Sequence, residues 1–396
     1  NRVLKFNADW EIQLVITEAD GRPLRNPQGL YVDEYGYIFI ADTDNNRIVN
    51  IAPTGEYVES FVKPESALYD SRYAFRPMRL SIDPVGQIYM INLEDYHGFV
   101  ILDAENNFRG YVAPTRLPYS FLDKLIEYFA TPEQKERLAK RMPPIHSSLS
   151  ICERGTIYST TRRTGIDQLK RFSNIGVNIF PKQGSSFGET RGDYVLRRFG
   201  VEVLEPDFVD LAVDPMGVIS LLDRTTGKVY QYDNDGMLLG VFAGKGTWGG
   251  KFISPVSIAQ DSRGALHVLD SHSGAIHVFQ PTAFIRKVHD ALALYYAGKY
   301  EEAVGPWQEI LAIDPNYSVA HIGMGKAYMK QERWQEAMDA YKAADDRTGY
   351  SAAFREIRKA FFRQYFGLLL LLAMVLLAGA ARGFVLLRKA QRSQGI

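Results

Sequence analysis

The sequence is poor in cysteine and has no net charge, and each shortage excludes a class of protein. Cys152 is the single cysteine among 396 residues, so no disulfide bond can form within the chain. Such a chain fits the cytosol and a disulfide-poor bacterial surface equally well. Lysine plus arginine and aspartate plus glutamate each number 46, so the formal net charge is zero. Because the chain lacks a net positive field to attract phosphates, we predict no nucleic-acid partner.

Sequence motifs for catalysis are also scarce. The chain has no lysine-containing phosphate loop and no cysteine–histidine cluster at metal-ligand spacing. Of the seven histidines, His97 and His272 fall in predicted outer turns, where we expect solvated side chains without a catalytic partner. An enzyme is therefore not the favoured interpretation, although these absences do not exclude one.

The chain is too long for one hydrophobic core, and its first 285 residues are built from repeats. The clearest copy, residues 26–61, has a proline, a short apolar strand ending in Asp-x-x-Gly, a second strand, a polar turn and two more strands. Further copies occupy residues 75–112, 143–180, 205–242 and 252–279. Alternating apolar residues and tight turns, in a repeat of about 40 residues, predict an all-β propeller with one four-stranded blade per repeat.

Each copy has a glycine in the turn between its first two strands, which predicts a positive φ angle there. These glycines are Gly36, Gly86, Gly155, Gly217 and Gly264. In four copies an aspartate three residues earlier is expected to accept hydrogen bonds from the turn backbone, namely Asp33, Asp83, Asp214 and Asp261. Cys152 replaces it in the third copy, where we expect a looser turn.

The copy at residues 26–61 also carries a set of residues typical of a known repeat, namely Pro27, Gly29, Asp33, Gly36, Asp42, Asn45, Asn46, Arg47 and Ile48. This set resembles the NHL-repeat family, and the five copies plus one further blade at the start of the chain predict six blades. Residues 1–16 align without a gap on residues 46–61, so we interpret them as the two outer strands of a further blade. Its inner strands, and a signal peptide, would then precede Asn1.

Residues 114–142 interrupt the repeats. Phe121, Leu125 and Phe129 recur at helical spacing, which predicts a helical insertion of two short helices. We interpret this insertion as a decoration between blades and not as a functional lid.

After Pro281 the apolar pattern becomes helical. The stretch Tyr300-Glu301-Glu302-Ala303 returns 34 residues later as Trp334-Gln335-Glu336-Ala337, and 34 residues is the tetratricopeptide (TPR) period. Residues 286–364 therefore resemble TPR repeats, with a last helix capping the stack. The resemblance predicts packing positions at Ala291, Leu294, Ala303, Trp307, Pro315, Gly325, Tyr328, Ala337, Tyr341 and Ala344.

One long apolar run follows the helical repeats. Residues 365–381 contain no charge and would extend roughly 26 Å as a helix, so we predict a transmembrane helix over 365–387 and a short basic tail over 388–396. Four cations flank each side of the run, so they do not orient it. We predict a single-pass bacterial membrane protein with propeller and repeats outside the cytoplasm. A cytosolic, tail-anchored protein is the alternative.

Specificity is expected where the copies differ. Aligned blades place Gly29, Arg79, Ser148, Asp210 and Ser257 in one ring of the channel, and Asn26, Arg76, Ile145, Asp207 and Ser254 in the next. Arg76, Arg79, Asp207 and Asp210 are thus the candidate ligand-binding residues. They could bind a zwitterionic or polar group, or pair with each other and close the channel; we favour the second interpretation.

Two functions remain open from the sequence. The favoured one is a membrane-anchored binding or scaffold protein, whose propeller face binds a ligand or protein and whose TPR groove docks a protein partner, such as a membrane complex. The alternative is a metal-dependent lactonase or esterase, since related six-bladed propellers hold a divalent ion such as calcium with carboxylates and amides. No ring sufficient for a metal is visible, so no cofactor is predicted.

Overall fold

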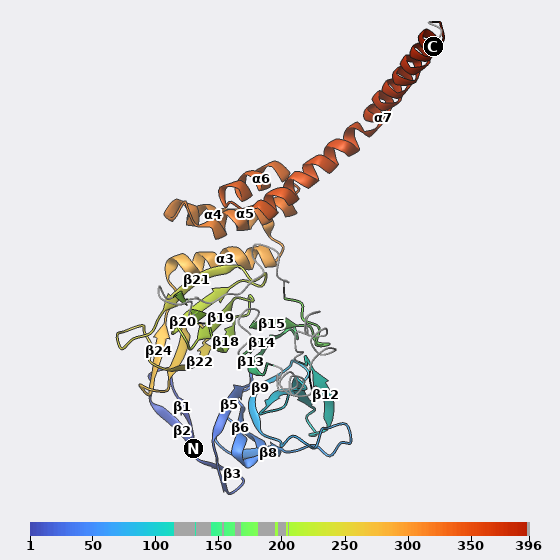
Figure 1. The fold of residues 1–396 in the computed structure, drawn as a ribbon. Coiled ribbons are helices and arrows are strands. Elements are labelled where there is room, and N and C mark those ends of the chain that lie inside the picture. Colours follow the sequence, from blue (N-terminus) through green and yellow to red (C-terminus); the bar gives the residue numbers. More distant parts are fainter. Residues whose placement is uncertain are drawn as a thin grey trace. The chain divides into compact units, whose positions relative to one another are not determined.

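The computed structural model describes residues 1–114, 131, 144–152, 154–162, 168–180, 195–196, 203–204 and 206–393. The chain forms two compact units, Asn1–Thr282 and Ala283–Ile396. In the described residues, the first unit is mainly β-sheet, with one short 3-10 helix (Thr43–Asn45), and the second is helical (Figure 1). The predicted boundary after residue 285 falls inside the first helix of the second unit. The helical insertion predicted over residues 114–142 lies outside the described residues, except for Pro114 and Thr131.

The described part of the first unit contains a β-propeller with five blades. The chain order of the strands is also their order in each sheet, as in sequential antiparallel hairpins. Three blades have four strands: β5 (Pro27–Val32), β6 (Ile38–Asp42), β7 (Arg47–Ile51), β8 (Tyr57–Phe61); β9 (Pro77–Ile82), β10 (Ile88–Asn92), β11 (Phe99–Leu102), β12 (Phe108–Val112); and β18 (Phe208–Val213), β19 (Ile219–Asp223), β20 (Lys228–Tyr232), β21 (Leu238–Ala243). Two have three strands: β13 (His146–Ile151), β14 (Ile157–Thr161), β15 (Leu169–Phe172); and β22 (Pro255–Gln260), β23 (Leu266–Asp270), β24 (Ala275–Phe279).

Three further strand pairs complete the described β structure. They are β1 (Val3–Phe6) with β2 (Ile12–Ile16), β3 (Glu18–Ala19) with β4 (Arg22–Pro23), and β16 (Val195–Leu196) with β17 (Val203–Leu204). The first pair confirms the two strands predicted over residues 1–16.

The core of the propeller lies between the blades. Inner strand β5 packs beside β9, β9 beside β13, β13 beside β18, and β18 beside β22. One apolar cluster joins Phe39 and Ile48 of one blade to Leu80 and Met90 of the next. All five residues of β6, β10, β14 and β19 are buried, because a neighbouring blade covers each face of these sheets.

The first turn of each blade has the predicted chemistry. The five turn glycines have φ angles between 73° and 88°. Asp33 Oδ1 accepts hydrogen bonds from the amides of Tyr35 and Tyr37, at 2.9 and 2.8 Å, and Asp83 repeats this arrangement. In the third blade the Gly155 amide still donates to the Cys152 carbonyl, at 2.8 Å.

The second unit is a stack of helices. They are α3 (Ala283–Tyr296), α4 (Tyr300–Ile313), α5 (Ser318–Lys330), α6 (Trp334–Ala343) and α7 (Arg347–Ser393), and each packs on the next. Most predicted packing positions are buried, including Ala303, Trp307 and Ala337, which are fully inaccessible. The prediction for Pro315 was wrong, since this residue is exposed between α4 and α5. Pro315 follows the C-cap residue Asp314, where a proline is common after a helix end, and it stays outside the core.

Close packing of the helices depends on Gly323 in α5. A Cβ at this position would lie 2.5 Å from Cε2 of Trp307. Gly323→Ala is therefore expected to lower the free energy of unfolding of the helical unit by about 1–3 kcal/mol, measured by thermal unfolding. The control is Gly305→Ala in α4, where a Cβ meets no atom within 4 Å, and this exposed helical site should be unchanged or stabilised, by up to about 1 kcal/mol. Equal effects of the two variants would contradict this packing argument.

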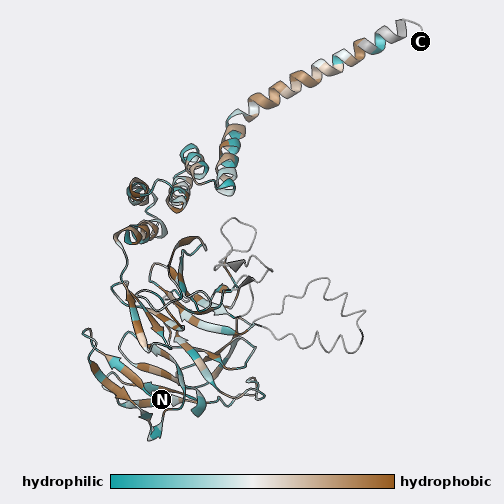
Figure 2. Ribbon diagram, turned by 60° about the vertical axis from the view of Figure 1, so that its left-hand side comes forward, coloured by the Kyte–Doolittle hydropathy of each residue, from teal (hydrophilic) through white to brown (hydrophobic). Residues whose placement is uncertain are grey.

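Helix α7 is one continuous helix through the predicted cap, the apolar run and part of the basic tail. It is long and apolar enough to cross a membrane, with a mean hydropathy of 2.3 in its most apolar 18-residue window. Figure 2 shows this apolar stretch in brown along α7. The helix is thus a candidate membrane anchor by length and composition.

Candidate functional site

The predicted channel ring is assembled around Asp210. This residue lies on β18, between Ser148 on β13 and Ser257 on β22. The hydroxyls of Ser148 and Ser257 each donate to one Asp210 carboxylate oxygen, both at 2.6 Å. The amides of Leu211 and Ile258 donate to the same two oxygens, each at 3.0 Å. Asp210 is 8% exposed, so its buried carboxylate with four donors ties three inner strands together.

Arg79 occupies the same ring on β9 and also bonds to a neighbouring blade. Its Nη1 donates to the backbone carbonyl of Gln28. Among the described residues, no ion pair joins Arg79 to Asp210. The hydrogen bonds of Arg79 and Asp210 therefore hold blades together.

The second predicted ring lies where the inner strands begin. Arg76 precedes β9 and pairs with Asp44, with 2.7 Å between Nη2 and Oδ1. Asp207 precedes β18 and pairs with Arg224 at 2.5 Å, while Arg162 Nε is 3.5 Å away. Each predicted residue thus has an opposite charge beside it, but Arg76 and Asp207 are not paired with each other within the described part.

These charges share one end of the propeller, which we call the entry face. It is formed by the starts of the inner strands and the turns that follow the second strands, because Pro77 pairs with Asn92 and Phe208 with Asp223. Arg76, Arg162 and Arg224 remain 34%, 42% and 41% exposed there. The entry face therefore presents both signs of charge to solvent.

The polar run at residues 41–47 is structural. Asp42 Oδ2 is 2.9 Å from Arg47 Nε and 2.8 Å from Asn45 Nδ2, and its Oδ1 accepts the Arg25 amide at 2.7 Å. Arg47 also donates to the carbonyls of Ala19 and Arg22. Both Asp42 and Arg47 are buried, so this pair joins the blade to its preceding loop.

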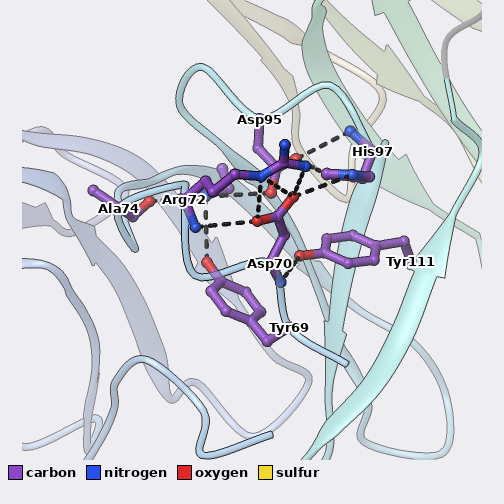
Figure 3. Close-up of polar contacts among 8 residues, drawn as sticks. Tyr69, Asp70, Arg72, Ala74, Asp95, His97 and Tyr111 are labelled. Carbon is purple, nitrogen blue, oxygen red and sulfur yellow. Dashed lines mark hydrogen bonds and ion pairs between the residues drawn. The ribbon is translucent and has the colours of Figure 1, made fainter. Parts of the chain in front are cut away.

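A second polar cluster on the entry face was not predicted. In the second blade, His97 lies between two carboxylates: its Nδ1 is 2.8 Å from Asp95 Oδ1 and its Nε2 is 3.7 Å from Asp70 Oδ2 (Figure 3). Arg72 binds Asp70 through Nε and Nη2, and the Tyr111 hydroxyl accepts the Asp70 amide at 3.1 Å. His97 was interpreted as a solvated turn residue; it is 38% exposed but firmly partnered.

The charges of this cluster stabilise one another. The side-chain and backbone hydrogen bonds of Arg72 lower the pKa of Asp70 to about 2. Burial raises the pKa of Tyr111, which therefore stays protonated. The short Asp95–His97 spacing was a local signal in the sequence, but Asp70 comes from a separate loop. The arrangement holds the loop before β9 onto the second blade.

His146 is a buried histidine with a definite prediction of pH dependence. Its Nδ1 is 2.7 Å from Ser159 Oγ and its Nε2 is 3.1 Å from the Ala113 carbonyl. Burial lowers its pKa from 6.5 to about 4. As pH falls from 6.5 to 4, His146 becomes protonated in the unfolded chain but stays neutral in the folded chain. The propeller should therefore lose about 3 kcal/mol of stability over this window, and none from His146 above it.

The measurement compares urea unfolding at pH 7.5 and 4.5 for the natural chain, His146→Gln and the exposed-turn control His272→Gln. The loss attributable to His146 should vanish in the first variant and persist in the second. An unchanged pH dependence in His146→Gln would contradict the prediction.

Comparisons with known proteins agree with the helical part of this architecture. A tetratricopeptide repeat family model matches residues 294–358. No curated protein matches the sequence.

Solved structures resemble the chain only distantly. Virginiamycin B lyase from Staphylococcus aureus is 14% identical, with a TM-score of 0.37 over 65% of this chain and 70% of that chain. A protein of unknown function from Bacteroides thetaiotaomicron is 12% identical, with a TM-score of 0.40 over 63% and 54%. A chain of a nidogen–laminin complex is 11% identical, with a TM-score of 0.40 over 70% and 89%. At these values the likenesses carry no argument about function.

Proposed function

We propose that this chain is a membrane-anchored binding protein, with a propeller that binds a ligand or protein and TPR repeats that dock a protein partner. The observation that carries the proposal is the combination of the three parts in one chain. A propeller and a TPR-matched helical stack both typically mediate protein interactions, and an exposed apolar helix follows them. A membrane complex is the kind of partner that such an anchored protein would meet.

The propeller is proposed to be of the NHL type with six blades. The fully buried strands of other blades contrast with β23, which has one exposed and one half-buried residue, and with β24, where half-buried and exposed residues alternate. Leu269, Ile276 and Val278 are each 41–42% exposed on the uncovered face. Trp10, in the β1–β2 turn, lies 5.8 Å from the His267 ring of this blade. These features support a sixth blade in which two inner strands join β1 and β2.

The entry face is proposed as the binding face of the propeller. Arg76 and Asp207 begin inner strands there, with Arg224 and Arg162 near Asp207. A partner with groups of both charges would compete for these exposed pairs, whereas Arg79 and Asp210 lie one level deeper. Such pairs are worth little to folding, so they can be exchanged for ligand contacts.

The experiment is cross-linking in native membranes followed by mass spectrometry of the partners. Deleting residues 283–349 should remove at least one partner and leave the chain in the membrane. Arg76→Ala with Arg224→Ala should remove a different contact, made by the propeller. Identical partners for all three chains would contradict the proposal.

The proposed topology has the propeller and repeats outside the cytoplasm and the basic tail inside. Protease added to intact spheroplasts should then digest the propeller. Digestion only after lysis would instead support the cytosolic, tail-anchored alternative. For the alternative hydrolase, the described residues provide no group of three histidine, cysteine, aspartate or glutamate side chains that could hold a metal ion.

A further inference from the structure

The first part of α7, residues 347–364, has one buried side and one exposed side. Ala353 is fully buried and Ile357 half-buried, on the side that packs toward the repeats. The exposed side carries Phe354, Phe361 and Phe362, which are 49%, 51% and 52% exposed. On a helix with about 100° per residue, Arg358 lies among these aromatic side chains, and Arg355, Lys359 and Arg363 follow beyond Phe362. The surface that the repeats leave open therefore combines aromatic side chains with cations.

The charge of this segment is strongly one-sided. It contains five cations, Arg347, Arg355, Arg358, Lys359 and Arg363, and one carboxylate, Glu356. Lys359 Nζ is 2.8 Å from Glu356 Oε1, and the Arg355 pair with Glu356 is longer, at 4.0 Å. One carboxylate cannot neutralise five cations, so the segment keeps a net positive charge. The whole chain is neutral, which makes this excess a local feature.

The segment continues without a break into the apolar part of α7. Phe361 and Tyr365 lie with ring centroids 4.9 Å apart, and Tyr365 is the first residue of the uncharged run. Aromatic side chains at the end of a span sit at the level of lipid headgroups, where their apolar rings and polar edges are both accommodated. The exposed phenylalanines would then enter the interface, and the neighbouring cations would lie among the headgroups.

From this placement we infer that residues 354–366 bind the headgroups of anionic phospholipids. The inference rests on the proposed membrane anchoring and adds a ligand class to it. The cations attract the phosphate groups of the lipids, and the aromatic side chains insert into the membrane interface. An acidic protein surface could also attract these cations, but it would not explain why the basic segment runs directly into the uncharged span. The contact would hold the helical repeats close to the membrane surface.

The test uses the full chain in bilayers of equal phosphatidylcholine and phosphatidylglycerol with matched acyl chains. Mild detergent extraction and mass spectrometry then give the ratio of the two lipids retained by the protein. A cation at an anionic surface contributes roughly fivefold to binding. We expect phosphatidylglycerol to be enriched at least about fivefold, and the enrichment to disappear at high salt.

Matched variants locate the contact. Arg355→Gln, Lys359→Gln and Arg363→Gln together should lower the enrichment severalfold. The matched change Arg382→Gln, Arg388→Gln and Lys389→Gln, at the other end of the span where fewer aromatic side chains accompany the cations, should lower it less. Loss only in the second variant, or no enrichment in the natural chain, would overturn the inference while the anchoring stands. A chain released from the bilayer by alkaline carbonate would overturn both.

Discussion

Replacing Leu372 and Val375 with arginine is expected to move the chain out of the membrane fraction. Both side chains lie near the middle of the apolar run and are 53% and 60% exposed, so no protein surface shields them. An arginine at the centre of a span costs about 2.5–3.5 kcal/mol, and the replaced apolar residue loses a further 0.3–0.6 kcal/mol or so. The double variant should therefore insert less favourably by about 6–8 kcal/mol. Alkaline carbonate extraction followed by sedimentation measures the outcome.

The control adds the same two charges elsewhere. Leu68 and Ile313 are also exposed apolar residues, at 80% and 62%, and neither belongs to α7. Leu68→Arg with Ile313→Arg should remain in the membrane pellet. If the α7 double variant also remains in the pellet, α7 is not the anchor. If both variants leave it, the effect is one of charge and not of the span.

The second large effect is expected for Asp210→Ala. Removing this buried carboxylate leaves two serine hydroxyls and the Ile258 amide without this acceptor, while the Leu211 amide keeps only its longer bond to Ser148 Oγ, at 3.3 Å. Unsatisfied buried donors and loss of a charged hydrogen-bond partner together should lower the free energy of unfolding of the propeller by about 3–5 kcal/mol. Urea unfolding of the full chain in detergent measures the change.

Asp207→Ala is the matched control for this prediction. Asp207 lies three residues earlier and is half-buried, with its partners Arg162 and Arg224 about two-fifths exposed. Its loss should lower stability by at most about 1 kcal/mol. An Asp210→Ala variant with natural stability would show that the carboxylate is not holding the blades, and would return it to the ligand-binding candidates.

Much of the fold was predictable because its signals are local. A glycine with positive φ and an aspartate three residues earlier build each first turn from neighbouring residues, as in Asp33–Gly36. The TPR spacing likewise repeats at a constant interval, so the buried Trp307 and Tyr341 could be assigned without coordinates. Pro315 was misassigned because a pattern position does not say whether a loop residue turns inward.

The candidate site was less predictable because its side chains meet across blades. Aligning the repeats placed Ser148, Asp210 and Ser257 in one ring, which is where the structure has them. The partners of Arg76 and Asp207 are in other turns, and those turns differ from blade to blade. The Asp70–His97 cluster joins a blade to a preceding loop, which has no repeat to align.

The sequence by itself determined the repeat architecture, the TPR stack and the apolar helix, since periodicity and composition specify each of them. Only the tertiary structure decided which polar side chains form hydrogen bonds between blades and which remain exposed to solvent. The reason is distance along the chain: Asp210 meets side chains 62 and 47 residues away. Such contacts depend on the register of packed strands, which no local pattern encodes.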